Sequence, residues 1–232
     1  MRFFVLPLFK DQWAFHCQAS IPPTGRIARW VDYASRKWEG LAETPTKSWK
    51  NRLYQTGMRL MDRIDHHEWF FKSVPTHITP IKAPVYHPKV LPASQIRQRL
   101  VRLVAEKRPY HKRYFALSCL WLPLTATFTL VPIVPNIPLF YNLFRVYSHY
   151  RAYRGAEHLD QLLTEERLQF DSPLPSPMES RESLFCDTLN QPFPVTAIRS
   201  MCHELDLPLL EISLLRAHGQ TAGTPHSSKK SE

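Results

Sequence analysis

The chain has 232 residues and a formal net charge of +10, from 30 Lys and Arg against 20 Asp and Glu. This length suits one domain or two small ones. The four cysteines stand far apart in the sequence, so we expect reduced thiols rather than a disulfide framework or a zinc site. The sequence holds six glycines and no recognisable catalytic or phosphate-binding motif, and therefore predicts no enzyme, no cofactor and no bound metal.

The positive charge suits an anionic membrane surface, the mitochondrial matrix or nucleic acid. No nucleic-acid-binding motif is present, so we expect no nucleic-acid partner. The first residues are too short an apolar run for a secretory signal, and they lack the Arg- and Ser-rich pattern of a transit peptide. Any targeting signal is therefore expected to be internal.

Residues 1–20 predict a β-hairpin. Two apolar runs, residues 2–8 and 13–19, flank the polar Lys10-Asp11-Gln12 turn. A hairpin of two strands is marginal in water, so it must pack on other elements. Residues 21–73 predict amphipathic helices, because apolar side chains recur there at helical spacing, with a second helix over residues 48–72. Five prolines make residues 74–92 an extended connector.

Residues 93–168 predict a membrane-associated helical region. A helix is expected over residues 94–107, and residues 115–144 then carry no formal charge. This uncharged stretch is long enough to cross a bilayer, which needs about 20 apolar residues. Seven Lys or Arg precede it between residues 97 and 113, and tyrosines crowd both ends, as expected at a membrane interface.

Four prolines are expected to break this membrane segment: Pro123, Pro132, Pro135 and Pro138. Two shapes follow, a single span with its proline segment near an interface, or a re-entrant hairpin with both ends on one side. Positive charge on both borders favours the hairpin. An alternative hypothesis to membrane insertion is a soluble helical module that docks on a partner through the stretch.

Four basic residues before the stretch are expected to bind anionic lipid, with cardiolipin as the expected example. They are Lys107, Arg108, Lys112 and Arg113. No Asp, Glu, Lys, Arg or His lies within residues 115–144, and coupled ion transport usually needs such a residue inside the membrane. His66-His67-Glu68 suggests a metal-binding site. Adjacent side chains on a helix point about 100° apart, however, so we favour a solvated or core histidine pair.

Residues 169–194 contain a Pro- and Ser-rich run and predict a flexible linker. A helical pair is expected over residues 195–217, and a disordered tail over residues 218–232. The expected fold class is mainly α, with an N-terminal β-hairpin, amphipathic helices, one proline-broken membrane segment and a C-terminal helical pair.

Three blocks carry a family resemblance: MRFFVLPL at residues 1–8, RLYQTGMRLMDRIDHHEWFFKSVP at residues 52–75, and VPNIPLFYNLFRVYSHYRAYRGAEHL at residues 134–159. Together with the ending LLRAHGQ they resemble the mitochondrial K+/H+ exchange-related proteins over most of residues 1–218. These blocks indicate kinship and supply no catalytic residues.

The resemblance implies a mitochondrial inner-membrane protein linked to potassium–proton exchange. The larger excess of basic residues before the stretch would place the N-terminal part on the matrix or cytoplasmic side, so in the inner membrane we expect the larger part to face the matrix. Since the uncharged stretch lacks an ion pathway, we expect an accessory or regulatory subunit that needs a protein partner or further copies of itself. The alternative is a membrane-anchored scaffold or assembly factor without a role in ion transport.

Overall fold

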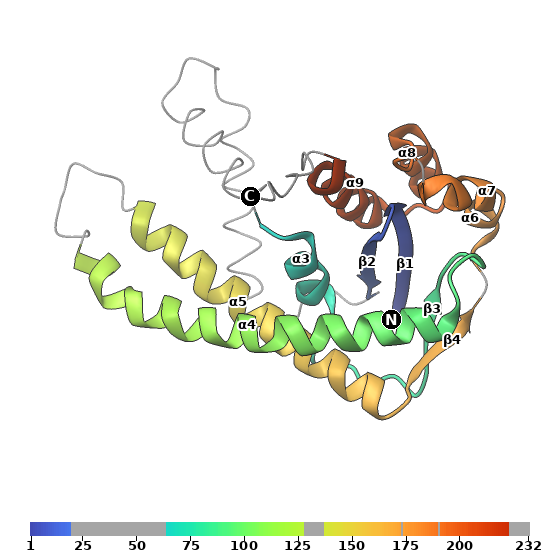
Figure 1. The fold of residues 1–232 in the computed structure, drawn as a ribbon. Coiled ribbons are helices and arrows are strands. Elements are labelled where there is room, and N and C mark those ends of the chain that lie inside the picture. The colour runs from blue at the N-terminus through green and yellow to red at the C-terminus, as the bar shows by residue number, and fades with distance from the viewer. Residues whose placement is uncertain (20–63, 128–136, 173, 190, 223–232) are drawn as a thin grey trace, which may run out of the picture. The chain divides into compact units, whose positions relative to one another are not determined.

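The computed structural model describes residues 1–19, 64–127, 137–172, 174–189 and 191–222 (Figure 1). The chain divides into two units, one of Met1–Ala19 with His66–Glu232, and one of Ser20–Asp65. All elements named below belong to the first unit. The amphipathic helices expected before residue 64 lie outside the described residues, as do Pro132 and Pro135.

A four-stranded mixed sheet organises the first unit, in the order β2-β1-β3-β4. The strands are β1 (Arg2–Phe9), β2 (Gln12–Gln18), β3 (Ala83–Tyr86) and β4 (Leu168–Ser172). β1 and β2 pair antiparallel from Arg2↔Gln18 to Phe9↔Gln12, so the predicted hairpin is confirmed. β3 lies parallel to both β1 and β4, and the chain therefore crosses over twice through helices.

The extended connector expected over residues 74–92 contains β3. Pro84 argues against a central strand, since proline cannot donate to a ladder. The structure accommodates it because β1 pairs with β3 only at Val85 and Tyr86.

Helices cover both faces of the sheet (Figure 1). The helices are α3 (His66–Ser73), α4 (Ala93–Thr127), α5 (Ile137–Thr164), α6 (Ser176–Glu179), α7 (Glu182–Cys186), α8 (Val195–Glu204) and α9 (Pro208–Ala222), with a 3-10 turn η2 (Asp187–Leu189). β1 alternates between two cores, as a strand buried on both faces must. Phe3 and Val5 meet α3, α4 and α5, whereas Phe4 and Leu6 meet the C-terminal helices.

The expectation of a flexible linker over residues 169–194 is wrong. The segment holds most of β4 together with α6, α7 and η2. Met178, Phe185 and Phe193 are at most 2% exposed and belong to the second core. Its prolines start short helices rather than keeping the chain extended, since Pro175 precedes α6 and Pro194 precedes α8. α8 and α9 form the C-terminal pair, and α9 runs on to Ala222, into the expected tail.

The described part of the uncharged stretch comprises the end of α4 and the start of α5. Pro123 does not break the chain, because α4 continues through it to Thr127 with the loss of one backbone hydrogen bond. Pro138 is the second residue of α5, a position where proline fits a helix. Among the helices of the described ranges, none combines the length and apolar character needed to cross a membrane.

Candidate functional site

α4 and α5 run antiparallel and extend beyond the sheet as a helical hairpin (Figure 1). We call residues 115–127 of α4 and 137–144 of α5 the hairpin end. At about 1.5 Å per residue these helical segments are about 20 and 12 Å long. The hairpin end has no charged side chain, so its surface is defined by apolar and aromatic groups.

Large apolar side chains of the hairpin end face solvent. Leu120 is 74% exposed, and Trp121 and Leu124 are each 51% exposed. Leu117, Tyr141 and Leu143 extend the same kind of surface. Leu117, Leu120, Trp121 and Leu124 recur at the spacing of one helix face, and an exposed apolar face marks an interaction site in a soluble or membrane-associated protein.

Asn142 ties the two helices together within the hairpin end. Its side-chain amide donates to the Ser118 carbonyl at 3.1 Å and to the Thr125 hydroxyl at 3.2 Å. The Asn142 side chain is buried, so its polar groups are turned inward while apolar groups cover the outside. The hairpin end is therefore a helix pair joined by its own buried hydrogen bonds, with apolar side chains on the outside.

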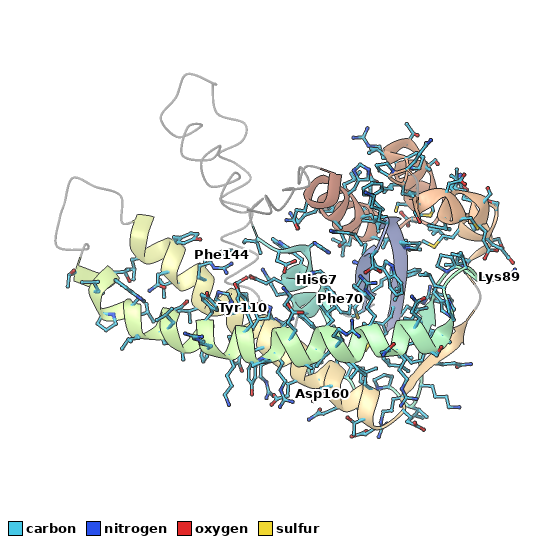
Figure 2. The ribbon with its side chains drawn as sticks, in the orientation of Figure 1. His67, Phe70, Lys89, Tyr110, Phe144 and Asp160 are labelled. Atoms are coloured by element: carbon cyan, nitrogen blue, oxygen red, sulfur yellow. The ribbon has the colours of Figure 1, made fainter. Side chains whose placement is uncertain are left out.

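The structure divides the four basic residues expected to bind lipid. Arg108 reaches α5, where its guanidinium lies 2.7 Å from Asp160 and 3.6 Å from Glu157 (Asp160 is labelled in Figure 2). Lys107 is half-buried and lies 3.6 Å from Glu106. Lys112 and Arg113 are exposed, one turn before the hairpin end, and neither forms an ion pair with a described residue.

A buried polar network joins α3, α4 and α5 where the hairpin leaves the sheet-covered core. We call it the Glu68 network, and it consists of Glu68, Lys72, His111, Arg145, Ser148 and His149. Of these six residues Glu68 alone is acidic, and its side chain is 3% exposed.

Three groups converge on the Glu68 carboxylate. Arg145 Nη1 and Nη2 donate to the two carboxylate oxygens at 3.1 and 3.4 Å. The Ser148 hydroxyl donates to Glu68 Oε1 at 2.5 Å and accepts from Lys72 Nζ at 2.9 Å. The network therefore contains two cations and one anion, linked by hydrogen bonds.

The histidines of α4 and α5 continue the network. Arg145 Nη2 lies 2.7 Å from His149 Nε2, and His149 Nδ1 lies 3.2 Å from His111 Nδ1. Because the guanidinium can only donate, we assign the His149 proton to Nδ1, which then donates to His111. Burial, reinforced by Arg145, lowers the pKa of His149 from 6.5 to about 4, which keeps the ring neutral.

Lys72 lies in an aromatic surrounding. Its ammonium is 4.0 Å from the centre of the Trp69 ring and 5.3 Å from that of Phe144, which is labelled in Figure 2. Burial lowers the pKa of Lys72 to about 8, and Arg145 adds to that effect, while Glu68 opposes it. Lys72 is therefore an amine whose protonation changes in the neutral to mildly alkaline range.

Glu68, His111 and His149 offer donor atoms within 4.8 Å of one another, which is a possible metal-ligand set. Arg145 argues against that use, because its guanidinium contacts both Glu68 and His149. A divalent cation would have to displace this guanidinium and would lie close to Lys72 as well. The donor set does not fit a metal without that rearrangement.

The His66-His67-Glu68 motif divides in the structure: the two histidine rings lie together, with centres 3.9 Å apart, and Glu68 turns away from them. His66 contacts the Gln220 side chain of α9, with its Nδ1 3.1 Å from the Gln220 oxygen, and His67 faces Phe15 of β2. Glu68 points instead into the network. Sequence reasoning missed this role because its partners are far along the chain, Arg145 being 77 residues away. The signal present was one acidic residue directly before the aromatic run Trp69-Phe70-Phe71.

Comparison with known proteins supplies the family. A family model described as mitochondrial K+-H+ exchange-related matches residues 2–163. An uncharacterised protein of Schizosaccharomyces pombe is 26% identical over 178 residues, covering 73% of this chain and 78% of its own length. An uncharacterised protein of Saccharomyces cerevisiae is 36% identical over 87 residues, covering 37% of this chain and 27% of its own length. No solved structure matches. Since the family match covers most of the chain, including the hairpin and the Glu68 network, this protein belongs to the mitochondrial K+-H+ exchange-related family.

Proposed function

We propose that this protein is an accessory or regulatory subunit of mitochondrial K+/H+ exchange, held on the inner membrane by its hairpin end. Family membership supports the link to exchange. The observation that carries the membrane attachment is the exposed apolar surface of the hairpin end beside Lys112 and Arg113. Apolar side chains in the acyl region with basic groups at the headgroups is the arrangement that favours anionic membranes.

The geometry supports a re-entrant attachment. α5 returns along α4, so both helices leave the hairpin end on the same side (Figure 1). The described helical parts of the hairpin end reach about 12 to 20 Å, comparable with one leaflet of a hydrocarbon core about 30 Å thick. The excess of basic residues before the stretch supports placing the sheet and its helices on the matrix side.

An accessory role fits the chemistry of the hairpin end better than an ion pathway. Residues 115–144 contain no Asp, Glu, Lys, Arg or His, whereas coupled transport usually depends on such a residue within the membrane. The exchanging pathway would therefore be supplied by a protein partner or by further copies of this chain.

Swelling of mitochondria in potassium acetate tests the exchange role. Acetic acid enters as the neutral acid and releases a proton in the matrix, and K+/H+ exchange removes that proton while admitting K+, so water follows. Mitochondria lacking this protein should swell more slowly, and the intact chain should restore the rate. Normal swelling and normal shrinkage without the protein would contradict the exchange role and favour the scaffold or assembly factor.

Two matched pairs of substitutions test the membrane attachment. Leu120→Asp with Leu124→Asp places charge on the hairpin end, and should release the protein from membranes during carbonate extraction. Leu209→Asp with Ile212→Asp is the control, because these α9 side chains are 68% and 52% exposed and lie outside the hairpin. Retention of the hairpin variant on membranes would contradict the attachment.

A further inference from the structure

The Glu68 network lies where three helices meet at the base of the hairpin. Glu68 and Lys72 come from α3, His111 from α4, and Arg145, Ser148 and His149 from α5. Beside the network, Gly155 allows α5 to touch the α3 backbone at Phe71, so the two helices are in close contact. Any change in the charge of the network therefore acts on the joint between α3 and the hairpin.

The network holds one more cation than anion. Glu68 is paired with Arg145 at 3.1 Å, and the Lys72 ammonium reaches the carboxylate through Ser148. Burying an incompletely paired charge is costly, because nearby water cannot solvate it. Each proton that the network takes up adds one positive charge to this excess, and each proton that it loses removes one.

We infer that the Glu68 network is a proton-controlled latch, which holds α3 to the base of the hairpin more firmly as protons leave it. The inference concerns the hold between the helices and does not depend on the exchange role proposed above.

The groups that face the two titrating side chains set the direction of the effect. Lys72 is faced by Glu68 of its own helix, by Arg145 and Arg151 of α5, and by Arg216 of α9. Burial, together with three cations against one anion, makes the protonated amine less favourable than it is in water.

His149 responds in the same sense as Lys72. Six charged or titratable groups face it: Arg145 of its own helix, Glu68 and Lys72 of α3, and His111, Tyr110 and Tyr114 of α4. Protonation of His149 would place a further cation against Arg145, and the hydrogen bond from Arg145 to Nε2 would be lost. Acid therefore loosens the latch through His149, while loss of the Lys72 proton tightens it in the mildly alkaline range.

Lys72 is the side chain to vary, because two substitutions are expected to change the opening of the latch in opposite directions. In Lys72→Met the cation is removed at every pH, so the latch should stay tight. In Lys72→Arg the cation is permanent, so the latch should stay loose. A role in packing alone would make both variants looser and leave the pH dependence unchanged. Lys82→Met is the matched control, since Lys82 is exposed and lies outside the network.

Amide hydrogen exchange of α3 and α5 in the full-length protein, corrected for the intrinsic rate, measures the opening. With the amine titrating at about 8 in the closed latch and at its ordinary value when open, the opening constant should fall about tenfold from pH 7 to pH 9. Both Lys72 variants should lose this pH dependence. The opening constant should stay low in Lys72→Met and high in Lys72→Arg, and the control should keep the dependence.

Three outcomes would overturn the inference. The wild-type opening constant could be the same at pH 7 and pH 9, or both Lys72 variants could retain the tenfold change. The third outcome comes from repeating the exchange measurement with one equivalent of Zn2+ and no other added ligand. If Zn2+ suppressed both the opening and its pH dependence, then Glu68, His111 and His149 would be metal ligands rather than parts of a proton latch.

Discussion

Gly155 on α5 brings the α5 backbone directly against the carbonyl oxygen of Phe71 on α3. A Cβ atom built at Gly155 would lie 1.9 Å from that oxygen and 2.9 Å from the carbonyl carbon. Both atoms belong to the backbone, so no side-chain rotation could make room. The contact between α3 and α5, on which the Glu68 network depends, therefore requires glycine at this position.

Gly155→Ala should destabilise the protein although alanine is the better helix former. The intrinsic gain in the α5 helix is about 1 kcal/mol. Overpacking a tight contact typically costs about 1–3 kcal/mol, and a clash with backbone belongs at the upper end or beyond. We expect a net loss of stability in urea unfolding. Gly219→Ala is the control, because a Cβ there meets nothing within 4 Å; equal stability of the two variants would contradict the close contact.

The N-terminal hairpin could be predicted because its information is local. Two apolar runs and a polar turn lie within the first 20 residues, and β1 and β2 pair across that turn. The remaining strands could not be predicted in the same way. β3 has only four residues and includes Pro84, and it becomes a strand because β1 and β4 lie on either side of it. Tertiary contacts outweigh local preference there.

The polar site shows the same limit. Periodicity assigns helices to the segments around Glu68, His111 and Arg145, but does not say which faces meet. His149 lies 38 residues from His111, and Arg145 lies 77 residues from Glu68. Two of the three blocks that carry the family resemblance, residues 52–75 and 134–159, contribute side chains to this network, Glu68 and Lys72 from the first and Arg145, Ser148 and His149 from the second. Only the folded chain reveals that the resemblance converges on a charged cluster.

The Glu68–Arg145 pair should behave as a buried ion pair. Glu68→Gln leaves Arg145 without its counter-charge and should cost about 3–5 kcal/mol of unfolding free energy. Arg145→Met should cost a similar amount. The double variant should be more stable than the two single losses added together predict, because both charges are removed. Strict additivity in urea unfolding would contradict a direct interaction between the two side chains.

Arg97 and Glu166 provide the comparison for that cycle. They form an ion pair of nearly the same length, 3.0 Å, but their side chains are 49% and 73% exposed. Solvent screens such a pair, so the same two substitutions there should change stability little. A large effect at the exposed pair would mean that burial is not the cause of the effect at Glu68.

His16 should make the protein sensitive to acid. It is buried, and its Nδ1 lies 2.9 Å from the Ser213 hydroxyl of α9. Burial lowers the pKa of His16 from 6.5 to about 4, so between these values the unfolded chain binds a proton that the folded chain refuses. Stability is therefore retained above pH 6.5 and falls as the pH drops towards 4.

His16→Gln tests that explanation, since the amide can still reach Ser213 but does not titrate. The variant should lose stability less steeply between pH 6.5 and pH 4, the slope falling by up to one proton in urea unfolding at a series of pH values. His149, another buried histidine whose pKa burial lowers to about 4, should account for a further proton over the same range. An unchanged slope in the His16 variant would show that its ring is already protonated in the folded protein.

Lys112 and Arg113 should account for the preference of the hairpin for anionic lipid. Both are exposed one turn before the hairpin end, whereas Arg108 is engaged with Asp160 on α5. Each basic residue near an anionic surface contributes about 1 kcal/mol, so Lys112→Gln with Arg113→Gln should weaken binding to cardiolipin-containing vesicles about 30-fold at low salt. The loss should shrink as salt is added, because salt screens the attraction between these side chains and the lipid in the intact protein.

Arg102→Gln with Lys82→Gln is the control, because it removes the same charge from exposed positions outside the hairpin end. Equal weakening by both pairs in vesicle flotation would mean that net charge, rather than a basic collar beside the apolar surface, determines lipid binding.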